Sequence, residues 1–228
     1  MSDFFRFPHT AHLAWLGEGM PRDDKLLDDA EVEELLAGEV AVEEKVDGAN
    51  VGLSTDSRGE LRAQNRGRYL DPSASHPQFK RLFTWLAPKR DALTAALHPA
   101  LILFGEWCYA RHSVAYDALP DWFLGFDVYD REAALFWSTA RRDALFAELG
   151  IVPVPRLARG HFTLDELTGL FGASRVGSGP MEGLIVRRES ADQTLARAKL
   201  VRPAFTQAIE AHWSRAPIEP NSRADGGY

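Results

Sequence analysis

The sequence contains a single cysteine, Cys108, among 228 residues, which excludes an internal disulfide bond and a zinc site built from several thiolates. It has no apolar run near the roughly 20 residues that a transmembrane helix needs. The first residues, MSDFFRFPHT, lack the basic and long apolar regions of a secretion signal. We therefore expect a cytoplasmic protein without a membrane partner.

Linkers, low-complexity tracts and internal repeats are also absent. The hydrophobic share of 45% and the charged share of 26% are ordinary for a globular protein. These features predict one domain over residues 1–215, with an acidic segment, 1–38, packed on it. Residues 216–228, which contain Pro, Gly and Ser, are expected to form a mobile tail.

Positive charge is scarce overall, because the net charge is −7. The imbalance lies in residues 1–44, which hold 3 Lys and Arg against 12 Asp and Glu, whereas residues 45–228 hold 23 against 21. Phosphate binding depends on local potential rather than on total charge. A local basic set therefore remains a candidate for phosphate contacts, and it comprises Arg58, Arg62, Arg66, Arg68, Arg187 and Arg188.

Hydrophobic spacing and capping residues predict an alternation of short helices and strands. Helices are expected at 28–38, 77–86, 89–97, 138–149, 163–172 and 203–213. Strands are expected at 40–46, 50–56, 60–66, 100–107, 123–130, 181–188 and 197–202. Because the strands come in hairpin-like pairs and no Gly-x-Gly-x-x-Gly motif is present, the pattern favours an α+β fold with mainly antiparallel sheet over a Rossmann fold.

The sharpest local motif is EKVDGAN, from Glu44 to Asn50. Its lysine, Lys45, leaves a strand and enters an Asp-Gly turn, so its amine is held at the end of a rigid element. Alone, the motif is short enough to occur by chance, and a solvated turn lysine would explain it.

Further motifs follow in order as NRGRYL, FGEWCY, FLGFDVYD, EGLIVRR and RAKLVRP. With EKVDGAN, the series resembles the covalent nucleotidyltransferase superfamily of polynucleotide ligases and RNA capping enzymes. Within it, the chain is most similar to ATP-dependent RNA ligases of the type that seals nicked RNA. The resemblance implies an α+β nucleotidyltransferase (adenylation) domain, with two mainly antiparallel sheets flanking the nucleotide site.

The resemblance also implies a reaction in three steps. Lys45 attacks the α-phosphorus of ATP to form lysyl-AMP, the AMP moves to an RNA 5′-phosphate, and a 3′-hydroxyl displaces it. Attack requires a neutral amine, so we expect Lys199 and a bound Mg²⁺ or Mn²⁺ to lower the pKa of Lys45. Lys199 would also neutralise charge on the α-phosphate.

Further roles are carried over to the matching residues. Glu182 would bind the metal as a catalytic residue, and Glu106 would contact the ribose and the metal. Phe126 would stack on the adenine. The remaining nucleotide contacts are expected from Glu44, Asn50, Arg66 and Arg197.

Two alternatives stay open. A DNA ligase or capping-type nucleotidyltransferase is less favoured, because only 29 residues follow Lys199 and no C-terminal oligonucleotide-binding domain is expected. The second alternative is a nucleotide- or RNA-end-binding module that lacks sealing activity. If the chain is a ligase, the predicted partners are nicked or structured RNA ends, with a partner protein as a further source of RNA affinity.

Overall fold

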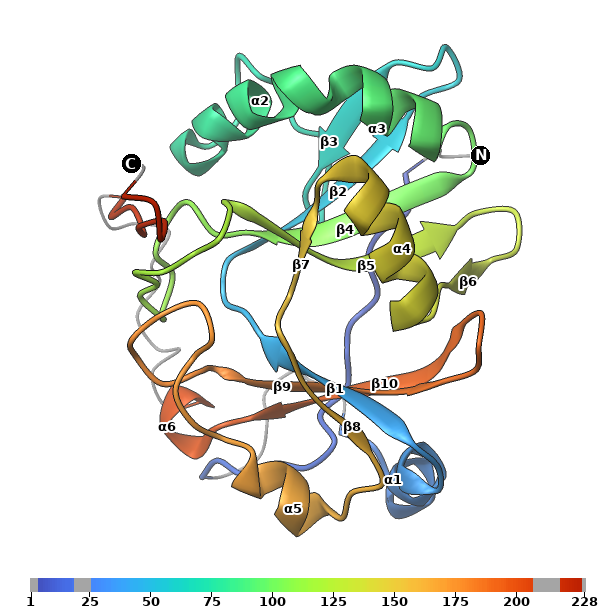
Figure 1. Cartoon of the computed structure of the whole chain (residues 1–228), viewed down its shortest axis with the longest axis vertical. Helices are drawn as coiled ribbons and strands as arrows, with labels where there is room; N and C mark the ends of the chain where they lie inside the picture. The colour runs from blue at the N-terminus through green and yellow to red at the C-terminus, as the bar shows by residue number, and fades with distance from the viewer. Residues whose placement is uncertain (1–3, 19–25, 207–217, 227–228) are drawn as a thin grey trace.

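Two β-sheets face each other and form the framework of the molecule (Figure 1). The computed structural model describes residues 4–18, 26–206 and 218–226. The four-stranded sheet has the order β10–β9–β1–β8, and all its neighbours are antiparallel. Its strands are β1 (Val40–Lys45), β8 (Arg156–Gly160), β9 (Gly183–Glu189) and β10 (Thr194–Val201).

The six-stranded sheet has the order β3–β2–β4–β5–β6, and β7 pairs in parallel with β5. Its strands are β2 (Ala49–Thr55), β3 (Leu61–Gln64), β4 (Leu101–Trp107), β5 (Phe123–Asp130), β6 (Leu135–Phe136) and β7 (Val152–Pro153). The predicted α+β class with two mainly antiparallel sheets is confirmed. The short strands β6, β7 and β8 were not predicted.

Helices cover the outer sides of both sheets, and the helix at 139–149 lies alongside β5 and β7 (Figure 1). They are α1 (Asp29–Leu36), α2 (Lys80–Leu86), α3 (Arg90–Leu97), α4 (Thr139–Leu149), α5 (Leu164–Gly169) and α6 (Pro203–Thr206). Their ends follow local chemistry: Ser138 caps the start of α4, and Gly150 ends it with a left-handed φ of 61°. None of the helices in the described ranges has the length and apolar character that crossing a bilayer requires.

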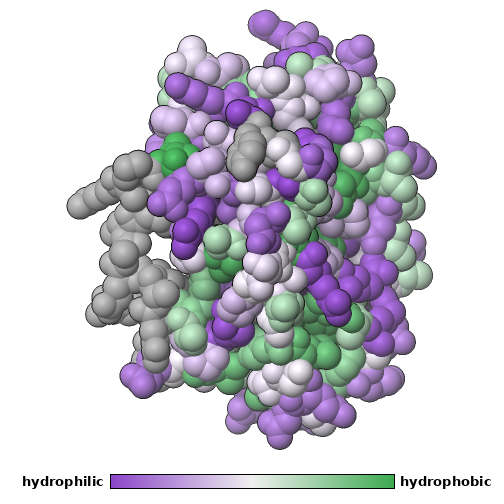
Figure 2. Space-filling view, turned by 60° about the vertical axis from the view of Figure 1, so that its left-hand side comes forward, coloured by the Kyte–Doolittle hydropathy of each residue, from purple (hydrophilic) through white to green (hydrophobic). Residues whose placement is uncertain are grey.

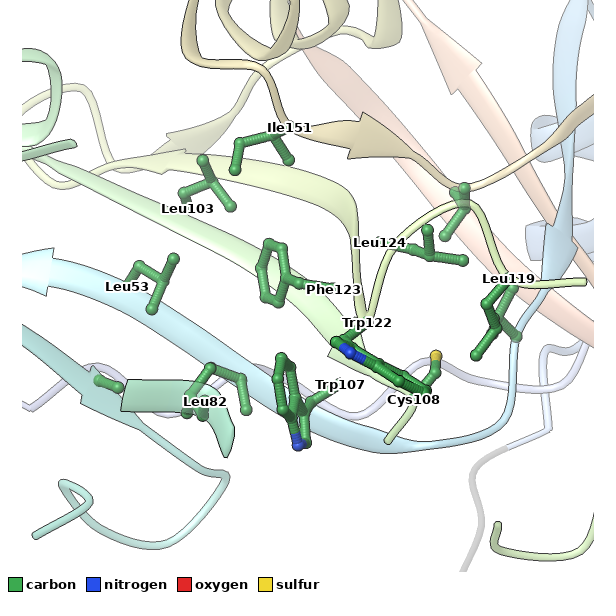
Figure 3. Packing of buried hydrophobic residues seen from close by; sticks show 14 of the residues in the cluster. Leu53, Leu82, Leu103, Trp107, Cys108, Leu119, Trp122, Phe123, Leu124 and Ile151 are labelled. Atoms are coloured by element: carbon green, nitrogen blue, oxygen red, sulfur yellow. The ribbon is translucent and has the colours of Figure 1, made fainter. Parts of the chain in front are cut away.

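Two hydrophobic clusters fix these layers. Beneath α2 and α3, Leu53, Leu82, Trp107 and Phe123 pack on the outer face of the six-stranded sheet (Figure 3). A second cluster, which includes Val42, joins β1, β9 and β10 to α1 and α5. Because successive strand residues point to opposite faces, the alternate residues of β1, β4 and β10 are left to face the other sheet.

The N-terminal segment fills part of the space between the sheets (Figure 1). The Phe5 ring stacks on Tyr129, with centroids 3.8 Å apart, and the Phe7 ring lies edge-on to Phe104 at 4.9 Å. Further along, this segment runs beside β10, where the Leu13 N–H donates to the Lys199 carbonyl at 2.8 Å. The N-terminal segment therefore contacts both sheets.

The described part of the C-terminal segment makes packing contacts. Residues 218–226, expected to be mobile, pack on the loop that follows β4, and Asn221 is 3% exposed. The helix expected at 203–213 is described as α6 at its start, and residues 207–217 lie outside the described residues.

A buried ion network joins the two sheets. Glu43 of β1 accepts hydrogen bonds from Arg142 at 2.6 Å and from Arg187 at 2.8 Å. Arg187 also donates to Asp127 of β5 at 2.8 Å, and Arg197 pairs with the same carboxylate. Burial alone would raise the pKa of Glu43, but Arg142 and Arg187 hold it below its ordinary value. We call these five residues the inter-sheet ion network.

We expect Asp127→Asn to destabilise the protein by about 3–5 kcal/mol, because it leaves buried arginine charge without its partner. Urea unfolding measures the effect. The matched control is Glu39→Gln, which breaks an exposed pair with Arg159 and should cost less than about 1 kcal/mol. Equal losses for the two variants would contradict a structural role for the network.

Candidate active site

Lys45 stands at the end of β1, on the face that looks toward the six-stranded sheet. Its Nζ donates to Glu182 Oε1 at 2.5 Å, and its side chain is 25% exposed whereas that of Glu182 is 5% exposed. In the β1–β9–β10 ladder, Lys45 pairs with Gly183, and Lys199 pairs with Ile185 one step along the same face. The structure thus pairs Lys45 with Glu182 and places Lys199 two strands away on the same sheet face, within electrostatic range of Glu182.

The Asp-Gly turn after Lys45 is pressed against β4. A Cβ atom on Gly48 would lie 2.7 Å from the Trp107 carbonyl oxygen, closer than real Cβ contacts, so the turn requires glycine. This approach places Glu106 of β4 within electrostatic range of Lys45. Asn50 pairs directly with Glu106 in the β2–β4 ladder, so their side chains share one face.

The field at the lysine is negative in the ligand-free site. Burial alone would lower the pKa of Lys45, but the carboxylates of Glu182, Asp47 and Glu106 raise it above the ordinary value. The sequence predicts a lowered pKa through Lys199 and a bound Mg²⁺ or Mn²⁺, and that prediction concerns the complex. The ligand-free site therefore holds Lys45 protonated, and its activation requires the carboxylate charge to be neutralised.

The carboxyl groups in turn are poorly solvated. Burial raises the pKa of Glu106 to about 8, although Lys45 and Arg66 oppose the shift. Burial also raises the pKa of Glu182. At neutral pH, Glu106 is thus mainly a neutral carboxyl group.

Two acceptor oxygens point to a missing donor or cation. Within the described parts of the chain, buried Glu182 Oε2 and Asn50 Oδ1 have no hydrogen-bond partner. Hard oxygen donors of this kind suit Mg²⁺ or Mn²⁺. Those same parts contain no group of three or more His, Cys, Asp or Glu side chains that could hold a metal alone. The donors present fit a cation that takes its other ligands from substrate and water.

Phe126 and Arg197 lie deeper, beside the N-terminal segment. The Phe126 ring meets Phe7 edge-on at 5.3 Å. The Arg197 guanidinium pairs with Asp127 and lies over the ring of Phe7, 4.6 Å from its centroid, and over that of Phe136 at 4.1 Å. In this structure Arg197 belongs to the inter-sheet ion network, and its expected nucleotide contact stays a prediction.

Glu44 points away from Lys45, because adjacent strand residues face opposite sides. Its carboxylate accepts from Ser174 Oγ at 2.5 Å and from the Arg175 N–H at 2.8 Å. Burial raises the pKa of Glu44 despite these hydrogen bonds. The structure therefore shows Glu44 anchoring a loop beneath the lysine strand, and the predicted adenine contact remains a prediction.

The predicted basic set divides in two. Arg187 is 2% exposed in the inter-sheet ion network, and Arg188 pairs with Glu34 at 2.6 Å, so the structure withdraws both from the phosphate-contacting set. Arg66 and Arg68 are exposed in the turn after β3, where Asn65 Oδ1 accepts from the Arg68 N–H at 2.9 Å.

A cavity of about 370 Å³ opens beside this site. Arg202 lines it, and the Arg202 N–H donates to the Glu182 carbonyl oxygen at 3.1 Å. In the surface view of Figure 2, hydrophobic side chains are more frequent in the lower half and hydrophilic side chains are more frequent in the upper part. The cavity lining includes one acidic and one basic side chain, Asp117 and Arg202.

Sequence reasoning missed the loop that holds Asp47. Asp47 Oδ2 accepts from the N–H groups of Ser113 at 2.7 Å and Val114 at 3.0 Å. These residues are 66 and 67 positions away along the chain, and no spacing rule connects them to the motif. Cys108 is a free, buried cysteine.

Comparison with known proteins adds the family context. The family model described as RNA ligase matches residues 38–201. None of the curated protein sequences that were compared matches the chain significantly.

Solved structures of a Naegleria gruberi RNA ligase are similar in fold. The ligase with PPi has a TM-score of 0.62 and 20% identity, over 90% of this chain and 64% of that one. A point variant with ATP and Mn has a TM-score of 0.65 and 17% identity, over 92% of this chain and 60% of that one. Another variant with ATP and Mn has a TM-score of 0.60 and 18% identity, over 80% of this chain and 55% of that one. The chain thus spans less than two thirds of each.

The raised pKa of Glu106 predicts a pH dependence of stability. The folded protein keeps a proton on Glu106 up to about pH 8, whereas the unfolded chain loses it near the ordinary value of 4.5. The folded state then binds more protons, so this group costs stability as pH rises between those values. We expect Glu106→Gln to become more stable relative to the unchanged protein as pH rises from about 5 to about 8, measured by urea unfolding.

The control for this experiment is Glu219→Gln, because the Glu219 side chain is 70% exposed. Its stability relative to the unchanged protein should stay constant over the same pH range. A Glu106→Gln variant that behaves in the same way would show that Glu106 is ionised in the folded state.

Proposed function

The chain belongs to the RNA ligase family, whose model spans residues 38–201, and we propose that it is an ATP-dependent RNA ligase. It joins RNA 5′-phosphate and 3′-hydroxyl ends through a covalent lysyl-AMP and an adenylylated RNA end. The observation that carries the proposal is the lysine at the end of β1, whose Nζ is 2.5 Å from a buried glutamate. A lone surface lysine would not be enclosed by carboxyl groups in this way.

In the first step, Lys45 Nζ is the nucleophile. The new bond joins Nζ to the α-phosphorus of ATP, and the bond from that phosphorus to the pyrophosphate oxygen breaks. Glu182 is the nearest acceptor for the proton that the amine must lose, because its Oε1 already takes that hydrogen bond and burial raises its pKa. Lys199, on the same sheet face two strands away in β10 and level with Glu43, supports the negative charge on the phosphate oxygens.

The nucleotide and a metal account for the unpartnered oxygens. We propose that Glu182 and Glu106 hold Mg²⁺ or Mn²⁺, and that Asn50 and Glu106 accept hydrogen bonds from the nucleotide. A bound cation would offset the carboxylate charge that keeps Lys45 protonated, and so would lower its pKa. Phe126 supplies an aromatic face for the adenine, and Arg66 supplies a charge for a phosphate. The Naegleria ligase variants crystallised with ATP and Mn support this ligand set.

In the later steps, the 5′-phosphate of RNA takes the AMP from Lys45, and the 3′-hydroxyl then attacks that phosphate and releases AMP. These displacements depend mainly on positioning and charge neutralisation. With Arg187 and Arg188 withdrawn, and with the Arg62 guanidinium placed over the Tyr69 ring, the exposed arginines left in the basic set are Arg58, Arg66 and Arg68. We therefore propose that RNA binding is weak at moderate salt unless a structured RNA or a partner protein adds affinity.

Incubation with ATP labelled at the α-phosphate and Mg²⁺ tests the first step. We expect acid-stable label on Lys45 alone, as located by peptide mapping, and none in excess chelator. Lys45→Ala and Lys45→Arg should both abolish labelling, because a guanidinium stays protonated and cannot attack. The control is Lys80→Ala, at an exposed lysine, which should label normally. Stable nucleotide binding without any label would favour the end-binding module instead.

The substrate is tested with nicked duplexes that carry RNA or DNA on each side of the break, at low and moderate salt. We expect the strand with the 3′-hydroxyl to be used better as RNA, because the 2′-hydroxyl and A-form shape distinguish it from DNA. Sealing should be slower than lysine labelling and should weaken as salt rises. Rapid, salt-insensitive sealing of an all-DNA nick would contradict the RNA assignment.

A further inference from the structure

The turn that follows the nucleophilic lysine is held by a part of the chain that the motifs do not include. The Asp47 N–H donates to the Tyr116 hydroxyl at 2.7 Å, while Ser113 and Val114 donate to the Asp47 carboxylate. Tyr116 is 2% exposed, so water does not compete with this bond. The position of the turn therefore depends on the position of Tyr116.

Tyr116 is itself fixed by the C-terminal segment. Its N–H donates to Asn221 Oδ1 at 2.9 Å, and its carbonyl accepts from the Ser222 N–H at 2.9 Å. The amide of Asn221 donates in turn to the Cys108 carbonyl at 2.8 Å, just beyond β4. The Asn221 side chain uses both ends of its amide within a buried site, a geometry that alanine cannot reproduce.

These bonds form a continuous path from the C-terminal segment to the active site. It runs from Asn221 to Tyr116, then to Asp47, and ends two residues from Lys45. Every link is a hydrogen bond of 2.7–2.9 Å between a side chain and the backbone. Asp47 carries charge that acts directly on Lys45, so a shift of this turn changes both the direction of the amine and its surroundings.

We propose that Tyr116 and Asn221 are positioning residues for the nucleophile, and that the C-terminal segment sets the orientation of Lys45 through them. The inference rests on the proposed function, because it assigns Lys45 the attack on ATP. Tyr116 and Asn221 act through Asp47 and do not touch the nucleotide. Misplacement of a reacting group by about 1 Å can cost up to about a hundredfold in rate.

The test compares Tyr116→Phe, Asn221→Ala and the double variant in the full chain. The initial rate of Lys45 labelling is measured against ATP concentration, at a temperature where unfolding curves show each variant folded. We expect each single variant to lower the limiting rate constant of labelling (kcat) about tenfold. The KM for ATP should change less than about twofold. Because both act on one path, the double variant should be no slower than the slower single variant.

The matched control is Ser222→Ala, in the same segment, since the backbone N–H of Ser222 makes the bond to Tyr116. It should label like the unchanged protein. A second measurement, independent of activity, is hydrogen exchange of the Asp47 amide without ATP. Exchange should quicken in Tyr116→Phe and Asn221→Ala, and stay unchanged in Ser222→Ala.

The inference is overturned if either single variant labels with the kcat of the unchanged protein, if the loss is confined to KM, or if the two effects simply add. Failure of the unchanged protein to form the label would overturn the proposed function, and the inference with it. Normal labelling by Tyr116→Phe would overturn this inference and would leave the proposed function intact.

Discussion

The buried ion network between the sheets is the constraint on which the site depends. Glu43 and Lys45 are alternate residues of β1, so the bonds that fix Glu43 to Arg142 and Arg187 also fix the start of the lysine turn. Asp127 does the same for β5, next to Phe126. Buried ion pairs of this kind contribute less to the free energy of folding than an apolar core does. Their geometry, however, fixes how the two sheets are placed against each other.

The site so positioned is acidic before any ligand arrives. The Lys45 amine is paired with Glu182, and nearby carboxyl groups raise its pKa, so the resting lysine is protected from reaction. Under the proposed function, activation then belongs to the complex with ATP and metal and not to the empty protein. This arrangement links the reactivity of the lysine to the arrival of substrate and metal, because both change the charge around one amine.

The elements that the sequence predicted well are those with strong local signals, such as α4 between Ser138 and Gly150. The features that the sequence did not predict involve partners that are distant along the chain. Glu43 and Arg187 look like ordinary strand charges, yet they are buried against each other across 144 positions. The motifs located Lys45, Glu106 and Glu182, but the sign of the pKa shift at Lys45 depends on three-dimensional distances. Nothing local marks Asn221, whose role comes from where its segment lies.

The N-terminal segment has a consequence beyond the site. β10 is the last strand of its sheet, and an unpaired strand edge is a template for association with another chain. Lys199 exchanges backbone hydrogen bonds with Ala11 and Leu13 on that edge, both at 2.8 Å. The same stretch of chain that places Phe7 between the sheets therefore shields β10 from intermolecular strand addition, and the folded protein gains resistance to aggregation at the strand that carries Lys199.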